Sequence, residues 1–273
     1  MKKLIIFDLD GVIYVGDEIL PHAPETLKTL RGRGLLVRFL TNNSTKSRKS
    51  YVEKLGRMGI EAREEEIVSS SYLARVRLDA LTGGRARVFI VGERGIADEL
   101  DGYTILGPAE RESADYVIVG YDSEFNYEKM SHALDALLAG AEMIATNRDP
   151  TFPQPGGKIL PGGGSIVAAV AAAWQREPFT CGKPNPFGIR HLMERSGAGG
   201  EETLLVGDRA DSDMLTGYNA GVDTCLVLTG ITRREELDSL PPEQKPTYTI
   251  DDLGELPGLL ERLAGGNSIQ NRG

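Results

Sequence analysis

Short runs of apolar, often β-branched residues recur along the chain at intervals that leave room for helices. They cover Leu4–Phe7 and residues 35–40, 88–91, 116–119, 143–145, 178–180, 204–206 and 225–228. Other stretches space their apolar residues by three and four, as helices do; they cover residues 23–30, 51–58, 127–138, 189–195 and 253–263. This alternation predicts an open α/β fold, in which helices join buried parallel strands by right-handed crossovers.

Two irregular stretches suggest that the middle of the chain is a separate domain. Leu81–Arg87 contains Thr82-Gly83-Gly84, and residues 151–164 are rich in proline and glycine, which break regular structure. We expect hinges near both. The prediction is a core built from residues 1–80 and 178–273, with a smaller α/β domain of residues 81–177 inserted into it.

Composition and charge narrow the classes of partner. Forty acidic and 31 basic residues give a net charge of −9, which repels nucleic acid, so an anionic small substrate must be captured by a few placed cations. The longest apolar stretches, such as Ile166–Trp174, are too short to cross a membrane, and a strand pattern directly follows Met1-Lys2-Lys3. We expect a cytoplasmic protein and leave a homodimer open. Cys181 and Cys225 form no metal-binding or disulfide pattern, so we predict buried thiols.

An acidic pair, Asp8 and Asp10, follows the first predicted strand. The two-residue period of a strand would point both side chains the same way, at the sheet edge where α/β proteins bind ligands. Adjacent carboxylates repel unless a dication, a lysine or a shared proton compensates. The alternative is that the pair caps a turn, with Gly11 supplying a permissive backbone.

The second strand ends in Thr41-Asn42-Asn43-Ser44, before a helix that we expect to begin near Thr45. Hydroxyl, amide and backbone N–H groups at a helix start can bind a phosphate, although an ordinary helix cap explains many such strings. Lys183 lies between Gly182 and Pro184, which would fix the direction of its ammonium group. A solvated loop lysine is the alternative.

A second acidic group follows the strand at residues 204–206: Asp208, Asp211 and Asp213 lie within six residues. Such acids also favour an ordinary helix start, but oxygen ligands at a strand end suit Mg²⁺. An acid pair, an anion-binding turn, a placed lysine and an acidic metal loop together are the parts that phosphoryl transfer requires.

These four segments, DLDGV, LTNNS, CGKPN and VGDRADSDM, resemble the four motifs of the haloacid dehalogenase (HAD) superfamily in the family's order. GYD at Gly120–Asp122, and ATNRD followed by LPGGGSIVAAV, are similar to the branch of NagD-like and p-nitrophenyl phosphatases. The resemblance covers nearly the whole chain. It implies a Rossmann-like, doubly wound parallel sheet with a large inserted α/β (type C2) cap domain.

The resemblance also implies a division of labour. Asp8 would attack phosphorus, Asp10 would protonate the leaving oxygen and then activate water, and three residues would hold the phosphoryl oxygens: Thr41, Asn42 and Lys183. An aspartate at position 10 argues for a phosphatase or phosphotransferase rather than a dehalogenase, because it supplies a general acid and base.

For the metal, the resemblance implies Mg²⁺ held by the Asp8 carboxylate, the Asp10 backbone carbonyl and Asp208, with Asp213 supporting its water shell. Asp211 receives no role. Four further residues are expected near the substrate in the inserted domain: Tyr121, Asp122, Asn147 and Asp149. The preferred hypothesis is hydrolysis of small phosphorylated metabolites such as p-nitrophenyl phosphate, sugar phosphates or nucleoside monophosphates.

Rival interpretations are weaker. The glycines at 162–164 and the pair Gly182-Lys183 do not complete a dinucleotide-binding or P-loop pattern. A receiver-type phosphorylation switch would be about half this size and would lack the insertion. A phosphomutase or phosphotransferase using the same Asp8 chemistry is the main alternative, and a silent phosphometabolite-binding protein is the other. A large inserted domain could serve a phosphatase or a phosphomutase, because it could close over the site and exclude water.

Overall fold

The computed structural model describes residues 1–153 and 158–265. Its α-helices are α1 (Ala23–Gly32), α2 (Arg48–Arg57), α3 (Ser70–Thr82), α4 (Arg94–Glu99), α5 (Tyr127–Leu138), α6 (Gly163–Trp174), α7 (Phe187–Ser196), α8 (Leu215–Ala220) and α9 (Leu256–Ala264). The longer strands are β1 (Leu4–Phe7), β4 (Leu36–Thr41), β6 (Arg87–Val91), β8 (Tyr116–Val119), β9 (Glu142–Ala145), β13 (Thr203–Gly207) and β14 (Asp223–Val227). The two- and three-residue strands are β2 (Tyr14–Val15), β3 (Glu18–Ile19), β5 (Ile67–Ser69), β7 (Thr104–Ile105), β10 (Thr151–Pro153), β11 (Ile159–Pro161), β12 (Phe179–Thr180) and β15 (Tyr248–Ile250).

The chain divides into two compact units. The first consists of residues 1–40, 54–66 and 189–273, and the second of residues 41–53 and 67–188. The predicted split into a core of residues 1–80 and 178–273 with an insert of 81–177 stays a prediction. Among the described residues, no helix combines the length and apolar character that crossing a membrane requires.

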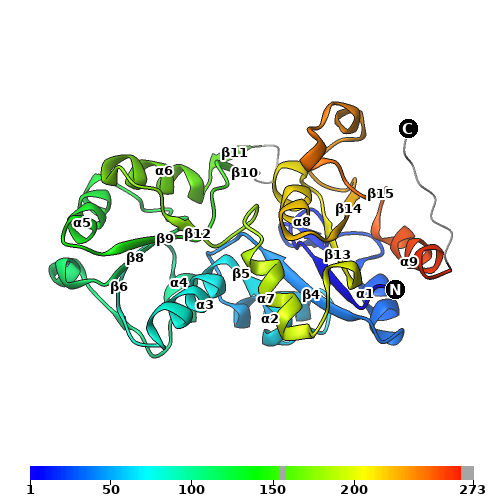
Figure 1. The fold of residues 1–273 in the computed structure, drawn as a ribbon, viewed down its shortest axis with the longest axis horizontal. Helices are drawn as coiled ribbons and strands as arrows, with labels where there is room; N and C mark the ends of the chain where they lie inside the picture. Colours follow the sequence, from blue (N-terminus) through cyan, green and yellow to red (C-terminus); the bar gives the residue numbers. More distant parts are fainter. Residues whose placement is uncertain (154–157, 266–273) are drawn as a thin grey trace. The chain divides into compact units, whose positions relative to one another are not determined.

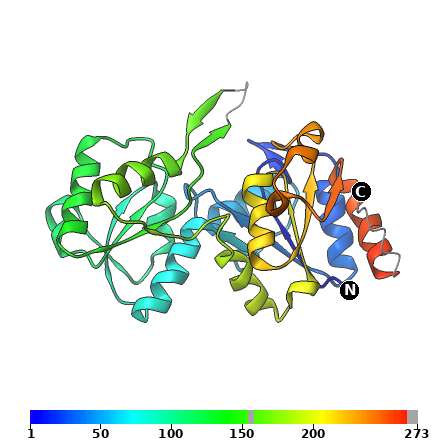
Figure 2. The same cartoon turned by 45° about the horizontal axis from the view of Figure 1, so that its top comes forward.

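The first unit is built on a parallel sheet with the strand order β15-β14-β13-β1-β4. Strand β1 is fully buried, which explains its unbroken apolar sequence. Helices α7 and α8 cover one face, and α1 and α9 cover the other (Figure 2). From β1 the chain first adds β4 on one side and later adds β13, β14 and β15 on the other. The point where the strand order reverses therefore lies between β1 and β13, and such points are where open α/β sheets bind ligands.

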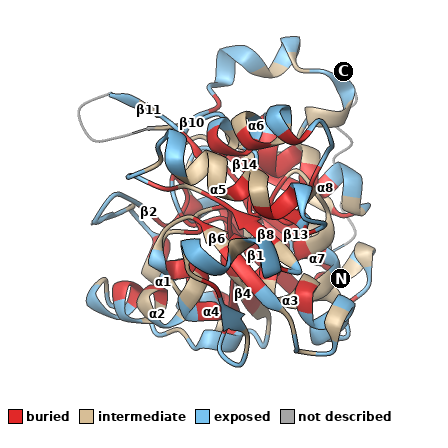
Figure 3. Cartoon of the chain, turned by 90° about the vertical axis from the view of Figure 1, so that its left-hand side faces the viewer, coloured by how far each residue is buried: buried red, intermediate tan, exposed pale blue. Residues whose placement is uncertain are grey.

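The second unit has its own parallel sheet, in the order β12-β9-β8-β6-β7. Helices α5 and α6 lie on one face of this sheet, and α3 and α4 lie on the other (Figure 1). Alternate residues of the strands, such as Val117 and Val119, pack with α5 and α6 in one apolar core. Figure 3 shows the buried strands of each sheet under partly exposed helices. The predicted α/β fold, with helices flanking parallel sheets, is confirmed.

One local expectation was wrong. Residues 151–164 were expected to lack regular structure, but they contain the antiparallel pair β10 and β11. A two-stranded ribbon has only edge strands, which tolerate proline. The stretch Leu81–Arg87 holds the end of α3, where Gly83 adopts the left-handed conformation (φ 64°) that often terminates helices. Part of the first stretch, residues 154–157, lies outside the described residues.

Candidate active site

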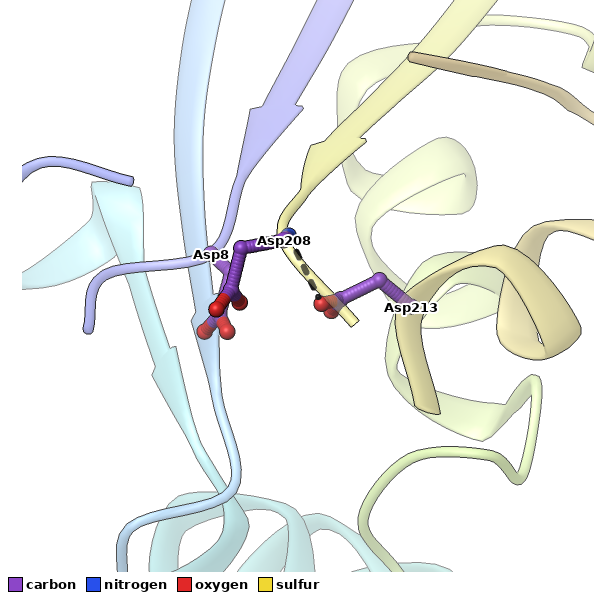
Figure 4. Close-up of side chains that lie close together, drawn as sticks. All are labelled: Asp8, Asp208 and Asp213. Carbon is purple, nitrogen blue, oxygen red and sulfur yellow. Dashed lines mark hydrogen bonds between the residues drawn. The ribbon is translucent and has the colours of Figure 1, made fainter. Parts of the chain in front are cut away.

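Three aspartates converge at the reversal point of the first sheet. Asp8 directly follows β1 and Asp208 directly follows β13, and these two strands are hydrogen-bonded neighbours. Each of Asp8, Asp208 and Asp213 offers a carboxylate oxygen that lies within 4.8 Å of the other two (Figure 4). Their residues are 8 %, 1 % and 0 % exposed, respectively. The structure thus brings together three of the predicted metal-site residues.

Asp213 is oriented by the turn that carries it. Its carboxylate accepts hydrogen bonds from the backbone N–H groups of Asp208 (3.2 Å) and Arg209 (3.1 Å). A short π-helical turn, Ala210–Met214, brings the side chain back to the end of β13. Gly207 makes room for it, because a Cβ at that position would lie 2.3 Å from Asp213 Cβ. A turn of this kind is often found at functional sites.

Asp208 is held by a loop that the sequence did not point to, residues 229–232 after β14. The Ile231 N–H donates to Asp208 Oδ2 (2.8 Å), and the Thr232 N–H donates to the Asp208 carbonyl oxygen (3.0 Å). Gly230 approaches so closely that a Cβ there would lie 2.0 Å from Asp208 Oδ2. Only the position of this Thr-Gly-Ile-Thr segment could have indicated its role, because it follows β14, the strand adjacent to β13.

The trio fits a hard divalent cation. Three buried carboxylates repel one another in a medium where charge is weakly screened, so their proximity needs a compensating positive charge or protons. All their donor atoms are oxygens, which are the ligands that Mg²⁺ prefers. The close approach of Gly11, whose added Cβ would lie 2.4 Å from Asp208 Oδ2, leaves no room for a larger residue beside the cluster.

Asp10 lies apart from the trio's buried environment. Strand β1 ends at Phe7, before both Asp8 and Asp10, so the expectation that their side chains point the same way stays a prediction. Asp8 is buried, whereas Asp10 is exposed at the start of a turn, where its backbone pairs with Tyr14. Gly11 has a φ of 80° and donates its N–H to the Tyr14 carbonyl oxygen (2.8 Å). This turn leads into the β2–β3 hairpin.

The second unit brings together the predicted phosphate-binding residues Asn42 and Lys183. The Lys183 N–H donates to Asn42 Oδ1 (2.7 Å), and Asn42 Nδ2 donates to the Lys183 carbonyl oxygen (3.0 Å). Thr41 is buried at the end of β4, and its Oγ1 accepts from the Asn43 N–H (3.2 Å). Cys181, in the same loop as Lys183, is fully buried, and burial raises the pKa of its thiol, which is therefore neutral.

The expected helix start near Thr45 was wrong, because α2 begins at Arg48. Asn43 explains the delay: its Oδ1 accepts from both the N–H (2.9 Å) and the hydroxyl (2.8 Å) of Thr45. An asparagine that bonds the backbone two residues ahead forms a turn rather than a helix. The proposed anion-binding turn is therefore a loop that precedes the helix.

The four residues expected near the substrate all lie in the second unit. Asp122 is buried and pairs with Lys129 (2.8 Å), and Tyr121 packs edge-on against Phe152 (5.1 Å between ring centroids). Asn147 and Asp149 both hydrogen-bond to Asn42 instead of standing apart from the phosphate-binding residues. No pattern along the chain indicated this connection.

Comparison with known proteins agrees with the fold and the aspartate cluster. A family model described as haloacid dehalogenase-like hydrolase matches residues 5–105, and a second, HAD-hydrolase-like model matches residues 180–256. A 5′-nucleotidase of Bacillus subtilis is 38 % identical over 255 residues, covering 93 % of this chain and 96 % of its own. Phosphoglycolate phosphatase 1A of Arabidopsis thaliana is 39 % identical over 274 residues, covering 93 % of this chain and 76 % of its own.

Solved structures give the same picture. A 4-nitrophenylphosphatase from Thermotoga maritima superposes with a TM-score of 0.87 at 34 % identity, covering 94 % of this chain and 97 % of that one. A glycerol phosphate phosphatase from Mycobacterium tuberculosis, solved in complex with magnesium, has a TM-score of 0.85 at 32 % identity, covering 93 % and 77 %.

The parallel sheets and the acidic cluster at the sheet's reversal point define a hydrolase of the haloacid dehalogenase type. The chain belongs to the haloacid dehalogenase-like family. Within that family it falls among the NagD-like phosphatases, which are hydrolases of phosphoric monoesters.

Proposed function

We propose that this enzyme hydrolyses phosphate monoesters of small metabolites through an aspartyl-phosphate on Asp8, with Mg²⁺ as its metal. The observation that carries the proposal is the buried trio of Asp8, Asp208 and Asp213, because a carboxylate next to a cation site can serve as a nucleophile. The magnesium-bound glycerol phosphate phosphatase among its structural neighbours supports the choice of metal.

The first half of the reaction transfers the phosphoryl group to the enzyme. An Asp8 carboxylate oxygen attacks phosphorus, the bond from phosphorus to the leaving oxygen breaks, and Asp10 gives that oxygen a proton. The exposed position of Asp10 on its turn suits a group that must meet both the leaving alcohol and water. Thr41, Lys183 and the backbone of Asn42 would hold the phosphoryl oxygens, because the Asn42 side chain is hydrogen-bonded within the protein.

The second half regenerates the enzyme. Asp10, now a carboxylate, takes a proton from water as the water oxygen attacks phosphorus, and the bond from Asp8 to phosphorus breaks to release inorganic phosphate. One positioned acid and base thereby serves both halves, typically for about 10²- to 10⁴-fold in rate.

The Asp8 carboxylate, the Asp10 backbone carbonyl and Asp208 would hold the metal, and Asp213 would support its water shell. When bound, Mg²⁺ supplies charge stabilisation to the phosphoryl oxygens. Four strands of the second parallel sheet, β6 to β9, lie within residues 81–177, which supports a cap-like role for this insert, although β12 of the same sheet lies just beyond it. A cytoplasmic location and a homodimer stay predictions from the sequence.

The substrate class is proposed from size and charge. The relatives are named for phosphoglycolate, sugar phosphates, nucleotides and p-nitrophenyl phosphate, all of them small phosphate monoesters. A protein with a net charge of −9 must rely on local cations for such anions, and Lys183 is the predicted one. A screen over sugar phosphates, nucleoside monophosphates and phosphorylated carboxylic acids would identify the preferred substrate.

Replacement of the nucleophile tests the proposal. Asp8→Asn should lower the turnover of p-nitrophenyl phosphate with Mg²⁺ by about 10⁴-fold or more, because an amide cannot form the phosphoenzyme. Asp17→Asn is the matched control: Asp17 is an exposed aspartate of the turn between β2 and β3 and should be dispensable. Circular dichroism would verify that both variants fold.

Trapping separates hydrolysis from transfer. Acid quenching during turnover should give protein carrying one phosphoryl group in the wild type and none in Asp8→Asn. Release of inorganic phosphate in step with p-nitrophenol indicates a hydrolase, whereas transfer to an added alcohol or sugar phosphate in preference to water would indicate a phosphotransferase or mutase. Full activity of Asp8→Asn would disprove the proposed mechanism.

A further inference from the structure

Asn42 is the centre of a hydrogen-bonded network in the second unit. Its amide orientation is unambiguous, since Oδ1 faces the Lys183 N–H, which can only donate, and Nδ2 faces acceptors. Those acceptors are the Lys183 carbonyl oxygen (3.0 Å) and the two carboxylate oxygens of Asp149 (3.1 and 3.0 Å). Both hydrogens of this amide are therefore used within the protein.

Asn147 completes the network from the loop after β9. Its Nδ2 donates to the Asn42 carbonyl oxygen (2.8 Å), and its Oδ1 accepts from the Asp149 N–H (3.1 Å). Asn42, Asn147 and Lys183 are all buried, whereas Asp149 is half-buried. A buried network of satisfied polar groups is rigid and specifies one arrangement.

The loops after β9 and β12 run together, which places the network's members in register. The Cys181 N–H bonds to the Ala145 carbonyl oxygen (2.9 Å), and the Gly182 N–H bonds to the Thr146 carbonyl oxygen (2.7 Å). Gly182 allows the loop to pack closely against Asn42, because a Cβ at this position would lie only 2.6 Å from Asn42 Oδ1. Two sets of contacts thus fix the backbone of Lys183, which lies three residues after β12: the hydrogen bonds to the strand end and loop of β9, and the hydrogen bond to Asn42.

We propose that Asn147 and Asp149 are positioning residues for phosphate binding: they fix Asn42, and Asn42 fixes the backbone of Lys183. The inference rests on the proposed function, in which Lys183 holds a phosphoryl oxygen. It gives a different role to Asn147 and Asp149, which the sequence-based expectation placed only near the substrate. A carboxylate beside a phosphate dianion is repulsive, whereas a carboxylate that accepts from Asn42 polarises that amide and strengthens its bond to the Lys183 N–H.

The substrate dependence of an Asp149 variant distinguishes the two roles. Every substrate carries the same phosphoryl group, so loss of positioning should lower kcat/KM equally for p-nitrophenyl phosphate and ribose 5-phosphate, by about 10-fold in Asp149→Ala. The competitive inhibition constant of inorganic phosphate, measured with Mg²⁺, should rise by a similar factor. Asp149→Asn keeps an oxygen acceptor for Asn42 and should remain within about 3-fold of wild type.

A double-mutant cycle tests whether Asp149 acts through Asn42. If it does, Asp149→Ala should cost less than about 2-fold in an Asn42→Ala background, because the contact is already absent. Asp149→Ser serves the same cycle if the alanine variant does not fold. Independent, multiplicative losses would overturn the inference. So would a loss confined to ribose 5-phosphate with unchanged inhibition by phosphate, which would show that Asp149 contacts the sugar.

Two controls separate this inference from the proposed function. Lys183→Ala should weaken both turnover and inhibition by phosphate, and if it does not, the proposed phosphate site itself is wrong. If Lys183→Ala is impaired but Asp149→Ala matches wild type, only the positioning role fails. Asp98→Ala is the matched control, because Asp98 is an exposed aspartate of the same unit that pairs with Arg94 (3.1 Å), and it should leave both measurements unchanged.

Discussion

At the scale of single residues, glycines determine how closely the backbone approaches the aspartate cluster. Gly11 and Gly230 both lie against Asp208, and Gly207 lies against Asp213. At each of the three positions a Cβ would come within 2.4 Å of an aspartate atom, a distance that real side chains do not tolerate. The lack of a side chain at these three positions therefore lets the backbone pack directly against the carboxylates and hold them in place.

Gly11→Ala should disrupt the site more than its backbone conformation alone explains. Gly16→Ala is a matched control, because both glycines have a positive φ (80° and 59°) but only Gly11 lacks space for a Cβ. The left-handed conformation should cost each variant about 1–2 kcal/mol of stability. Gly11→Ala should additionally lose at least about 10-fold in kcat, because Asp208 must move. Equal activities of the two variants in a p-nitrophenyl phosphate assay would contradict this.

The two cysteines should make stability fall in alkaline solution. Burial raises the pKa of both the Cys181 and the Cys225 thiols, and both stay protonated when folded. Above pH 9 the unfolded thiols ionise while the folded ones do not, so each should lower the free energy of unfolding by about 1.4 kcal/mol per pH unit. Below that pH their contribution to stability is fully present. Urea denaturation between pH 8 and 10.5 should show a shallower decline for the Cys181→Ala/Cys225→Ala double variant than for wild type.

Residue types at strand ends indicated two acidic segments, and the family resemblance selected the three aspartates that converge, but neither indicated the geometry around the trio. Asp8 and Asp208 directly follow apolar runs, and parallel strands bring such positions to one sheet edge. The exposure of Asp10 could not be predicted, because it depends on where the chain leaves β1. The support that Ile231 gives to Asp208 depends on strand order, which no local pattern encodes.

At the scale of elements, long periodic segments were predictable and short ones were not. Helix α5 has the predicted bounds, Tyr127–Leu138, and the strands β1 and β8 do as well. Strands of two residues, such as β2 and β7, are too short to show any periodicity. The delayed start of α2 arises from one side chain, Asn43, whose local hydrogen bonds compete with the helix.

Helix α5 is stabilised by Asn126, the residue that caps its N-terminus. Asn126 lies just before the helix with an extended backbone, and its Oδ1 accepts from the Lys129 N–H (3.0 Å). Asn126→Ala should therefore lower the free energy of unfolding by about 1 kcal/mol, whereas Asn126→Asp keeps the acceptor and should be close to neutral. Urea denaturation measures both. Equal destabilisation of the two variants would show that the cap is not what stabilises this end.

At the scale of the whole molecule, the order of the strands creates the site. Strands β1 and β13 are neighbours because the chain adds β4 on one side and returns on the other. Strand and helix alternation predicted the open α/β fold, and the family resemblance implied the doubly wound sheet. The assignment of residues 41–53 to the second unit was not, since it depends on contacts made far along the chain.

Divalent metal should stabilise the entire fold, because the carboxylates of Asp8, Asp208 and Asp213 repel one another when no cation is present. Saturating Mg²⁺, at about 100 times its dissociation constant, should add about 2.7 kcal/mol and raise the melting temperature by about 5 °C or more. Asp208→Asn should abolish this shift and raise the melting temperature of the metal-free protein, since one of three like charges is removed.

The exposed Asp211, which pairs with Arg209 (3.0 Å) outside the trio, provides the control for that measurement. Asp211→Asn should keep the full magnesium shift in the same thermal unfolding assay. A wild-type protein whose melting temperature is unchanged by Mg²⁺ would contradict the assignment of the trio as a cation site.

The pairing of β1 with β13 also has a consequence for the protein's synthesis. The Asp8 and Asp208 codons are two hundred positions apart, so the ribosome makes β1 long before β13, which is the neighbour of β1 on one side. Until then β1 has an unpaired edge and a fully apolar sequence, which is the kind of segment that aggregates or recruits chaperones. Under the proposed mechanism, which needs Asp208, a nascent chain should not cleave phosphate esters before its last third has emerged, and truncated products should be inert.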